Sequence, residues 1–194
     1  NEPYAIAKIA GIKLCESYYR QHQRNFYSIM PTNLYGPNDN FDPETSHVIP
    51  ALIRKFHNAV RFGSGSVQVW GSGTPRREFL YVDDLAQALI FLMESTNAED
   101  IYEKGITHIN VGTGLDLSID ELAATIARLV GFDGEIHFDT TMADGTLRKL
   151  LDVTRLRELG WVYTHSLEDG LRKTIDWYER SFERTEHGLE ASKT

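Results

Sequence analysis

The chain has 194 residues, of which 41% are hydrophobic and 25% are charged, the composition of a globular protein in water. Its net charge of −8 at pH 7 argues against a nucleic-acid platform, and no apolar run is long enough to span a bilayer. The single cysteine, Cys15, excludes an internal disulfide and fits a reducing compartment. We therefore expect a cytoplasmic protein with neither nucleic acid nor membrane as a partner. The seven histidines are scattered without metal-ligand spacing, so no metal site is predicted.

A phenol and an ammonium group mark the first predicted helix, which runs from about Pro3 to Arg20. Pro3 suits the first turn of a helix, where its missing N–H costs nothing. Tyr4 and Lys8 then lie one turn apart on one helical face, and a cation close to a phenol favours the phenolate. The pair is a candidate for proton transfer to or from a sugar or alcohol oxygen. An ordinary amphipathic helix with an exposed Tyr and Lys would show the same pattern.

Residues 26–30 are apolar and predict a buried parallel strand, which is followed by a turn-rich loop at residues 31–37. Loops at the carboxyl ends of parallel strands are where α/β proteins bind ligands. This loop is therefore a candidate ligand site. Plain turn chemistry is the alternative explanation of Asn33 and Gly36.

His47 stands at the start of a predicted helix over residues 48–57, which also carries Arg54 and Lys55. The dipole at a helix N-terminus favours the neutral form of a histidine, which can accept a proton. His47 is therefore a candidate proton-transfer group, and a capping or surface role is the alternative. The two cations are either a solvated face or ligands of an anion.

Residues 67–82 are predicted to form a hairpin-like pair of strands around a Gly/Ser/Pro turn. Trp70, Arg76 and Arg77 lie near this turn. They suit a nucleotide diphosphate, because Arg binds phosphate bidentately and an aromatic ring supports a base or a sugar. A charged hairpin tip beside a packed Trp is the alternative.

The remaining elements are predicted from caps and periodicity. Asp83 or Asp84 is expected to cap an apolar helix, and Ser118 with Glu121 is a capping box for a helix that Gly131 ends. The elements expected are helix 85–93, solvated loop 97–104, strand 107–112, helix 122–130, strand 135–139, a turn at 144–149, helix 154–159 and a long helix capped by Ser166 that frays from 186.

No glycine-rich phosphate loop of the Gly-x-Gly-x-x-Gly type occurs in the chain. If the first helix bears the proton donor of an enzyme with a nucleotide cofactor, such a loop is expected upstream of Asn1. The sequence is therefore expected to be the latter part of a longer protein. By itself, the 194-residue chain is expected to show no reductase activity.

Taken in order, these motifs resemble the extended short-chain dehydrogenase/reductases that act on nucleotide sugars. The matching motifs are Tyr4-x-x-x-Lys8, Pro31-Thr32-Asn33-Leu34-Tyr35-Gly36-Pro37, Trp70-Gly71-Ser72-Gly73 followed by Arg77-Glu78-Phe79 and Asp83-Asp84, Asn110-Val111-Gly112, and Arg148-Lys149-Leu150-Leu151-Asp152. Within that family the chain is most similar to the GDP-L-fucose synthases, through residues 1–8, 38–41, 46–52 and 144–149. The resemblance covers nearly the whole chain.

The resemblance implies C3/C5 epimerisation and NADPH-dependent C4 reduction of GDP-4-keto-6-deoxy-D-mannose. Tyr4 would protonate the C4 oxygen, Lys8 would favour the phenolate and hold the nicotinamide ribose, and His47 would be the general acid of the epimerisations. The implied NADP(H)-binding residues are Lys8, Pro31, Thr32, Asn33, Leu34 and His47, and the implied GDP-sugar-binding residues are Lys55, Trp70, Arg77, Asp144 and Lys149.

The fold expected is α/β, namely the latter part of a Rossmann-type parallel sheet with a smaller α/β substrate-binding domain. Residues 1–37 would end the dinucleotide-binding domain, and residues 38–194 would form mainly the substrate-binding domain, with 80–110 returning to the Rossmann sheet. The resemblance implies a homodimer, which the small residues Ala5, Ala7, Ala10 and Gly11 of the first helix permit.

Other functions remain open at this level. A nucleotide-sugar 4-epimerase or 4,6-dehydratase would retain an NAD that is not consumed and would act on UDP- or dTDP-sugars. A binding module without catalytic activity would hold a GDP-sugar or a partner subunit.

Overall fold

The computed structural model describes residues 2–191, and side chains as far as residue 181. The chain forms two compact units, each made from three separate stretches. Unit 1 comprises Asn1–Thr32, Asp83–Gly114 and Leu151–Thr164; unit 2 comprises Asn33–Val82, Leu115–Leu150 and His165–Thr194. Both units combine helices with parallel strands, so the predicted α/β class is confirmed.

Unit 1 is built on a parallel pair of strands, β1 (Ser28–Pro31) and β5 (His108–Val111), where Ser28 is opposite His108. Its helices are α1 (Glu2–His22), α3 (Val82–Ser95, from its second residue), α4 (Ala98–Tyr102) and α6 (Thr154–Glu158). The Tyr27 hydroxyl donates to the carbonyl oxygen of Leu92 at 2.7 Å and so ties the start of β1 to α3.

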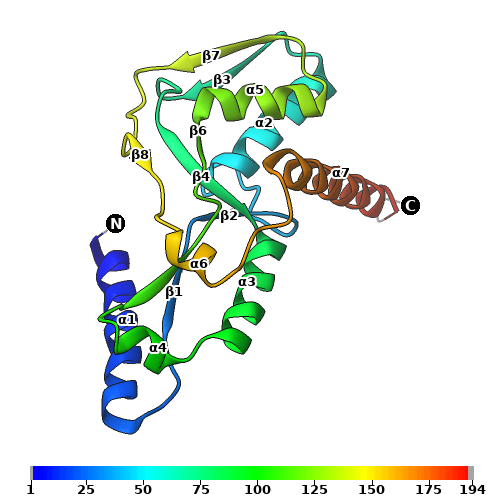
Figure 1. The fold of residues 1–194 in the computed structure, drawn as a ribbon. Helices are drawn as coiled ribbons and strands as arrows, with labels where there is room; N and C mark the ends of the chain where they lie inside the picture. The colour runs from blue at the N-terminus through cyan, green and yellow to red at the C-terminus, as the bar shows by residue number, and fades with distance from the viewer. Residues whose placement is uncertain (1, 192–194) are drawn as a thin grey trace. The chain divides into compact units, whose positions relative to one another are not determined.

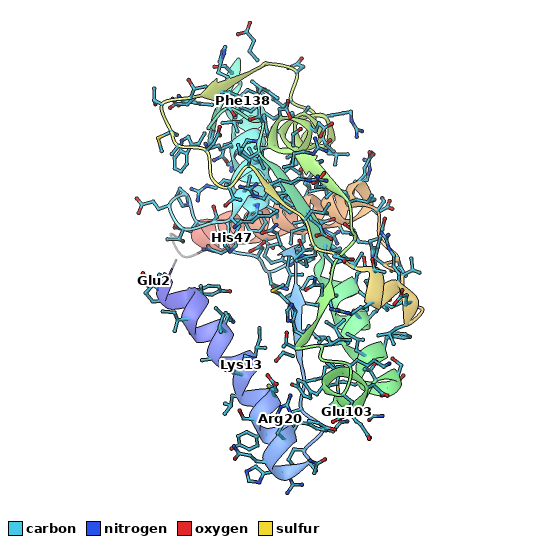
Figure 2. All side chains as sticks on the ribbon, turned by 60° about the vertical axis from the view of Figure 1, so that its left-hand side comes forward. Glu2, Lys13, Arg20, His47, Glu103 and Phe138 are labelled. Atoms are coloured by element: carbon cyan, nitrogen blue, oxygen red, sulfur yellow. The ribbon has the colours of Figure 1, made fainter. Side chains whose placement is uncertain are left out.

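Helix α1 is the least buried element of unit 1. None of its residues is buried, and Tyr4, Ile6, Ile9 and Leu14 are exposed. Figure 2 shows its side chains along its length, with Glu2, Lys13 and Arg20 labelled. The helix contacts β1 and α4, and the ring of Tyr19 lies 5.1 Å from that of Tyr102 on α4. Cys15 is half-buried on this helix rather than in a core.

The prediction of a solvated loop at residues 97–104 is wrong, because this stretch holds α4. Its apolar side chains Ala98, Ile101 and Tyr102 are buried. The amide nitrogen of Ala98 donates to the side chain of Asn25 at 2.7 Å, which satisfies an N–H that the helix itself leaves free. Burial against the rest of unit 1 therefore outweighs the polar composition of the stretch.

Unit 2 contains two sheets (Figure 1). In the larger one, β4 (Arg76–Tyr81) pairs in parallel with β2 (Asn33–Tyr35) and β8 (Arg148–Lys149), and antiparallel with β6 (Asp116–Ser118). The smaller one is the parallel pair of β3 (Ser66–Trp70) and β7 (Glu135–Asp139). The helices are α2 (Val48–Phe62), α5 (Ile119–Val130) and α7 (Leu167–Ala191).

The predicted hairpin at residues 67–82 does not form. Strands β3 and β4 both exist, but β3 pairs with β7 while β4 pairs with β2, β6 and β8. Gly71 and Gly73, between the two strands, have φ angles of +84° and +80°. Both angles lie in the left-handed region that favours glycine, so the chain turns at each glycine before it enters the other sheet.

Helix α5 begins and ends where its capping residues predict, whereas α2 begins as predicted but extends to Phe62 instead of His57. The Ser118 hydroxyl and the Glu121 carboxylate form the predicted capping box of α5, and Gly131 ends that helix with φ +81°. His47 is the N-cap of α2, and Pro50 occupies its first turn, where a missing N–H has no consequence.

Buried faces of α2, α5 and α7 form the core of unit 2 with β3 and β4. Helix α2 packs against both α5 and β3 (Figure 1). The core residues include Ile53, Phe56, Leu122 and Ile126, which are fully buried. Helix α7 adds Leu171, Ile175 and Tyr178, as its helical spacing predicts, while the side chain of Phe182 lies outside the described ones.

Several predicted boundaries differ from the observed ones. Asp83 and Asp84 lie in the first turn of α3 rather than capping it, and buried Asp84 accepts hydrogen bonds from the Thr164 backbone and hydroxyl. Helix α7 continues through Ala191, so residues 186–191 are helical rather than frayed, and residues 192–194 lie outside the described ones. Strands β2, β6 and β8 are too short to predict from periodicity, since each has two or three residues.

No helix within residues 2–191 combines the length and apolar character needed to cross a lipid bilayer. Within the same residues, no group of three or more His, Cys, Asp or Glu side chains is arranged to hold a metal ion.

Gly170 of α7 tests how tightly unit 2 packs. A Cβ atom at this position would lie 2.9 Å from Cζ of Tyr35 and 3.0 Å from Cδ2 of Tyr81. We expect Gly170→Ala to lower the free energy of unfolding by about 1–3 kcal/mol through overpacking, despite the better helix propensity of alanine. Gly11→Ala on α1 is the matched control: nothing lies within 4 Å of its Cβ, so a gain of about 0.5–1 kcal/mol is expected. Thermal and urea unfolding followed by circular dichroism would measure both, and equal effects would contradict the packing.

Candidate functional site

The five residues predicted to bind a GDP-sugar all lie in unit 2, on four different elements and the segment that joins β7 to β8. They are Lys55 on α2, Trp70 at the end of β3, Arg77 on β4, Asp144 between β7 and β8, and Lys149 on β8. Lys55 contacts Trp70, and Asp144 contacts the turn that follows Trp70. Strand pairing connects Arg77 with Lys149.

Lys55 and Trp70 form a cation–π pair. The ammonium nitrogen of Lys55 lies 4.9 Å from the centre of the Trp70 ring and donates to the carbonyl oxygen of Gln68 at 2.9 Å. Burial lowers the pKa of Lys55, because desolvation disfavours the charged form. Trp70 itself is 59% exposed, an unusual position for so large an apolar group. An exposed aromatic ring beside a cation can support a base or a sugar ring while the cation meets an anion.

The turn after Trp70 is fastened to Asp144. The Ser72 backbone N–H donates to Oδ1 of Asp144 at 2.9 Å, and the Ser72 hydroxyl donates to Oδ2 at 2.7 Å. These bonds lower the pKa of Asp144, the side-chain hydrogen bond being the larger cause. A Cβ atom on Gly71 would lie 2.5 Å from Oδ1 of the same carboxylate, so the close approach requires glycine.

Arg77 and Lys149 place two positive charges side by side. They are direct partners in the parallel pairing of β4 with β8. Arg77 Nη1 donates to the carbonyl oxygen of Arg76 at 2.8 Å, and a Cβ atom on Gly145 would lie 3.1 Å from Arg77 Nη2. Among the described residues, neither Arg77 nor Lys149 forms a salt bridge, although the Arg77 charge is a minor cause of the lowered pKa of Asp144. An external anion such as a diphosphate could therefore bind both cations.

His47 is an exposed residue at the start of α2, the helix that carries Lys55 (Figure 2). Its carbonyl oxygen accepts from the Ala51 N–H at 3.0 Å, while its imidazole makes no capping hydrogen bond. The ring is therefore not used to cap the helix. The adjoining Ser46 hydroxyl is buried without a hydrogen-bond partner.

Tyr4 and Lys8 lie in unit 1, one turn apart on α1. The Lys8 ammonium is 5.3 Å from the centre of the Tyr4 ring, and Tyr4 is 68% exposed. The expected stacking of phenol and cation on one helical face is observed. These two residues belong to one unit and His47 to the other.

The four residues of the predicted cofactor loop are divided between the units. Pro31 ends β1, and the Thr32 N–H donates to the carbonyl oxygen of Val111 at 3.0 Å, both within unit 1. Asn33 and Leu34 belong to β2 of unit 2 rather than to a loop, because they pair with β4. The Asn33 side chain donates to the carbonyl oxygen of Glu78 at 2.8 Å.

Sequence reasoning missed the role of Ser72, whose hydroxyl and amide together hold Asp144. A Gly-Ser-Gly turn directly after an exposed Trp was the available signal, since such turns leave backbone N–H groups free to bind a carboxylate.

A profile of the NAD dependent epimerase/dehydratase family matches residues 1–112 of the chain. The chain belongs to this family. Its relatives include the GDP-L-fucose synthase of Escherichia coli (strain K12), which is 58% identical over 188 residues, covering 95% of this chain and 58% of that protein. A putative GDP-L-fucose synthase 2 of Arabidopsis thaliana is 54% identical over 178 residues, covering 92% of this chain and 52% of that protein.

Among solved structures, a GDP-L-fucose synthetase from Naegleria fowleri bound to NADP matches with a TM-score of 0.81 and 32% identity. The match covers 93% of this chain and 56% of that one. The predicted resemblance to GDP-L-fucose synthases is thereby confirmed. The chain spans only about half to three fifths of the length of these family members.

The hydrogen bonds from Ser72 to Asp144 predict how the stability of the protein depends on pH. We expect Asp144 to titrate below the usual aspartate range, and Ser72→Ala to raise its pKa toward that range. Since the folded-state pKa is depressed, the anchor contributes stability above about pH 4 and loses it as the pH falls through the folded value. Carbonyl-carbon NMR of the carboxylate would measure the titration. Thr74→Val is the control, because the Thr74 hydroxyl contacts Ser72 but not Asp144; an Asp144 pKa that Ser72→Ala leaves unchanged would contradict the assignment.

Proposed function

We propose that the chain is the latter part of an enzyme that converts GDP-4-keto-6-deoxy-D-mannose to GDP-L-fucose by C3/C5 epimerisation and NADPH-dependent C4 reduction. The observation that carries the proposal is the strand-paired cations Arg77 and Lys149, which form no salt bridge among the described residues of a chain of net charge −8. An acidic protein with two cations at paired strand positions, outside any described salt bridge, is suited to a ligand with concentrated negative charge. The GDP-L-fucose synthase relatives supply the chemical identity of that ligand.

Unit 2 would hold the GDP-sugar. Arg77 would bind the diphosphate bidentately and Lys55 would meet it as a point charge, since its ammonium cannot form a fork. Trp70, exposed and already beside Lys55, would cover a ring of the ligand. Asp144 and Lys149 would contribute from the segment that joins β7 to β8 and from β8.

Unit 1 would form part of the dinucleotide-binding domain. Tyr4 and Lys8 fit a nicotinamide cofactor, because a solvent-facing phenol with a cation one turn away can bind a ribose and move a proton. Pro31 and Thr32 at the carboxyl end of β1, continued by Asn33 and Leu34, would line the nicotinamide. NADPH, when bound, supplies the hydride for C4. The Naegleria fowleri relative is described as bound to NADP.

Tyr4 and His47 are the proposed proton donors of the two reactions. Tyr4 would donate its phenolic proton to the C4 oxygen, and Lys8 would favour the phenolate that remains. His47 would be the general acid of the C3/C5 epimerisations, in which the 4-keto group stabilises an enolate. Its exposed imidazole, with no capping hydrogen bond, is suited to exchanging a proton with a substrate.

We further propose that the enzyme is a cytoplasmic homodimer. The exposed apolar side chains Ile6, Ile9 and Leu14 of α1, interspersed with small residues, would suit close contact with a second copy.

Ligand binding by unit 2 can be measured without catalysis. We expect the 194-residue chain to bind GDP in isothermal titration calorimetry, and Arg77→Ala to weaken binding at least ~10-fold, about 1.4 kcal/mol, by removing charge-assisted hydrogen bonds to the diphosphate. Arg128→Ala is the matched control, because Arg128 pairs with Glu168 on other elements of unit 2. Equal affinity for UDP would favour a 4-epimerase instead, and no GDP binding by the unmodified chain would contradict the proposal.

His47 and Tyr4 should separate the two reactions. In a chain extended upstream to the full length of its relatives, we expect His47→Asn to suppress solvent-deuterium exchange at C3 and C5 more than C4 reduction. Tyr4→Phe should do the reverse and lower reduction by about 10²–10⁴-fold, the contribution typical of a general acid. Mass spectrometry of the product and NADPH absorbance would report the two steps. Equal loss of both steps in His47→Asn, with the fold intact, would remove His47 from the acid role.

A further inference from the structure

The segment at residues 140–150, here called the strap, joins β7 to the end of β8 and carries two of the proposed ligand residues, Asp144 and Lys149. Every residue of the strap is exposed, so burial of apolar surface cannot hold it in place. Its backbone is attached at β8, a strand of only two residues, and by the Arg76 N–H, which donates to the carbonyl oxygen of Leu147 at 2.8 Å. So few backbone hydrogen bonds contribute little to keeping the strap in place.

Asp116 of β6 supplies a second attachment. Its Oδ1 accepts from Arg76 Nε of β4 at 2.9 Å, and its Oδ2 accepts from Arg148 Nε of β8. A third bond runs from Arg76 Nη2 to the Asp116 carbonyl oxygen at 3.0 Å. One carboxylate therefore connects three strands of the larger sheet in unit 2.

The burial of Asp116 sets it apart from the surface ion pairs around it. Its side chain is 7% exposed, whereas Glu121, the other partner of Arg76, is 57% exposed and 3.4 Å away. Exposed pairs contribute little, because water and salt screen them, and a shielded carboxylate with two guanidinium partners is screened less. The two arginines hold the pKa of Asp116 below its usual range, Arg148 being the larger cause.

The pairing register connects this carboxylate to the proposed ligand site. Arg76 is opposite Arg148, and the next pair along the same two strands is Arg77 with Lys149. If the Arg148 end of β8 is released, Lys149 loses its fixed place beside Arg77, and the strap is left attached mainly through Asp144 and Ser72.

We propose that Asp116 is a positioning residue that clamps the strap onto β4 and thereby holds Lys149 beside Arg77 for the diphosphate of the substrate. The inference rests on the proposed function for the ligand, while the clamp itself concerns only the described residues of unit 2. Asp116 does not touch the ligand. It acts through Arg148 and the two-residue strand.

Two substitutions break the clamp in the 194-residue chain. Asp116→Asn removes the shared charge, and Arg148→Gln breaks the same link from an exposed position, 61% accessible, where a folding defect is not expected. The position of the strap is read from the rate at which a lysine-specific endoprotease cleaves after Lys149, which is the strap's one lysine. Ligand binding is read from the Kd of GDP by calorimetry.

We expect both variants to raise the cleavage rate at Lys149 at least fivefold and to weaken GDP binding fivefold to tenfold. The double variant should be no worse than the stronger single one, because both changes break one link. Glu168→Gln is the matched control: Glu168 is also shared by two arginines, Arg128 and Arg172, away from the strap. Ile126→Val, a fully buried change on α5, controls for general loss of stability. Both controls should leave cleavage and GDP affinity near the unmodified values.

Failure of this inference can be told from failure of the proposed function. Unchanged cleavage at Lys149 in Asp116→Asn and Arg148→Gln overturns the clamp, whatever the GDP affinity. Equal cleavage in Ile126→Val, or additive effects in the double variant, also overturn it. If the unmodified chain binds no GDP, the proposed function fails and so does the link to the diphosphate, while the cleavage rates still decide whether Asp116 holds the strap.

Discussion

Strand β4 is the constraint on which unit 2 depends, because three other strands pair with it. Its first half is opposite β6 and β8 and presents Arg77 to the candidate ligand site, while Phe79, Leu80 and Tyr81 of its second half are buried. Successive side chains of a strand point to opposite faces, so these three consecutive buried residues cover both faces of the sheet. The second half of β4 is buried on both faces, so packing on both sides holds the strand that carries Arg77. The same strand therefore contributes to both the core and the candidate ligand site.

The two cations Arg77 and Lys149 of unit 2 stand out in a chain that is acidic as a whole. The chain carries a net charge of −8, and many of its carboxylates are paired with arginines, as Glu168 is with Arg128 and Arg172. Arg77 and Lys149 are exceptions, since they are like charges at paired strand positions, which repel each other, and neither forms a salt bridge among the described residues. An arrangement that costs stability, such as two like charges at paired strand positions, is expected at functional sites. The repulsion would be relieved by a bound anion, which gives the ligand a direct electrostatic gain.

Sequence patterns predict the local features of this fold well. The capping box of Ser118 with Glu121 and the stop at Gly131 depend only on near neighbours, and both are observed. The partner of β3 could not be predicted, because β7 lies far along the chain and both strands have the same alternating pattern. Helix α4 was also missed, because its stability comes from burial of Ile101 and Tyr102 against other stretches of unit 1.

In the candidate site, too, the local features could be predicted from the sequence and the long-range contacts could not. Residue types and resemblance pointed to Lys55, Trp70 and Arg77, whose side chains have recognisable chemistry. The partner of Asp144 could not be read from the sequence, because Ser72 is 72 positions away along the chain. The two carboxylate bonds of Asp116 likewise join strands that only the folded sheet brings together. Long-range pairing is therefore what turns a set of suitable residues into an arranged site.

The segmental construction of unit 2 has a consequence for biosynthesis. Its core combines Ile49 and Phe56 from the first stretch with Leu122 from the second and Leu171 from the third. Chains emerge from the ribosome N-terminus first, so the parts of α5 and β4 that pack against α7 lack this partner until α7 has been translated. The core of the unit therefore cannot be completed before its third stretch has been translated.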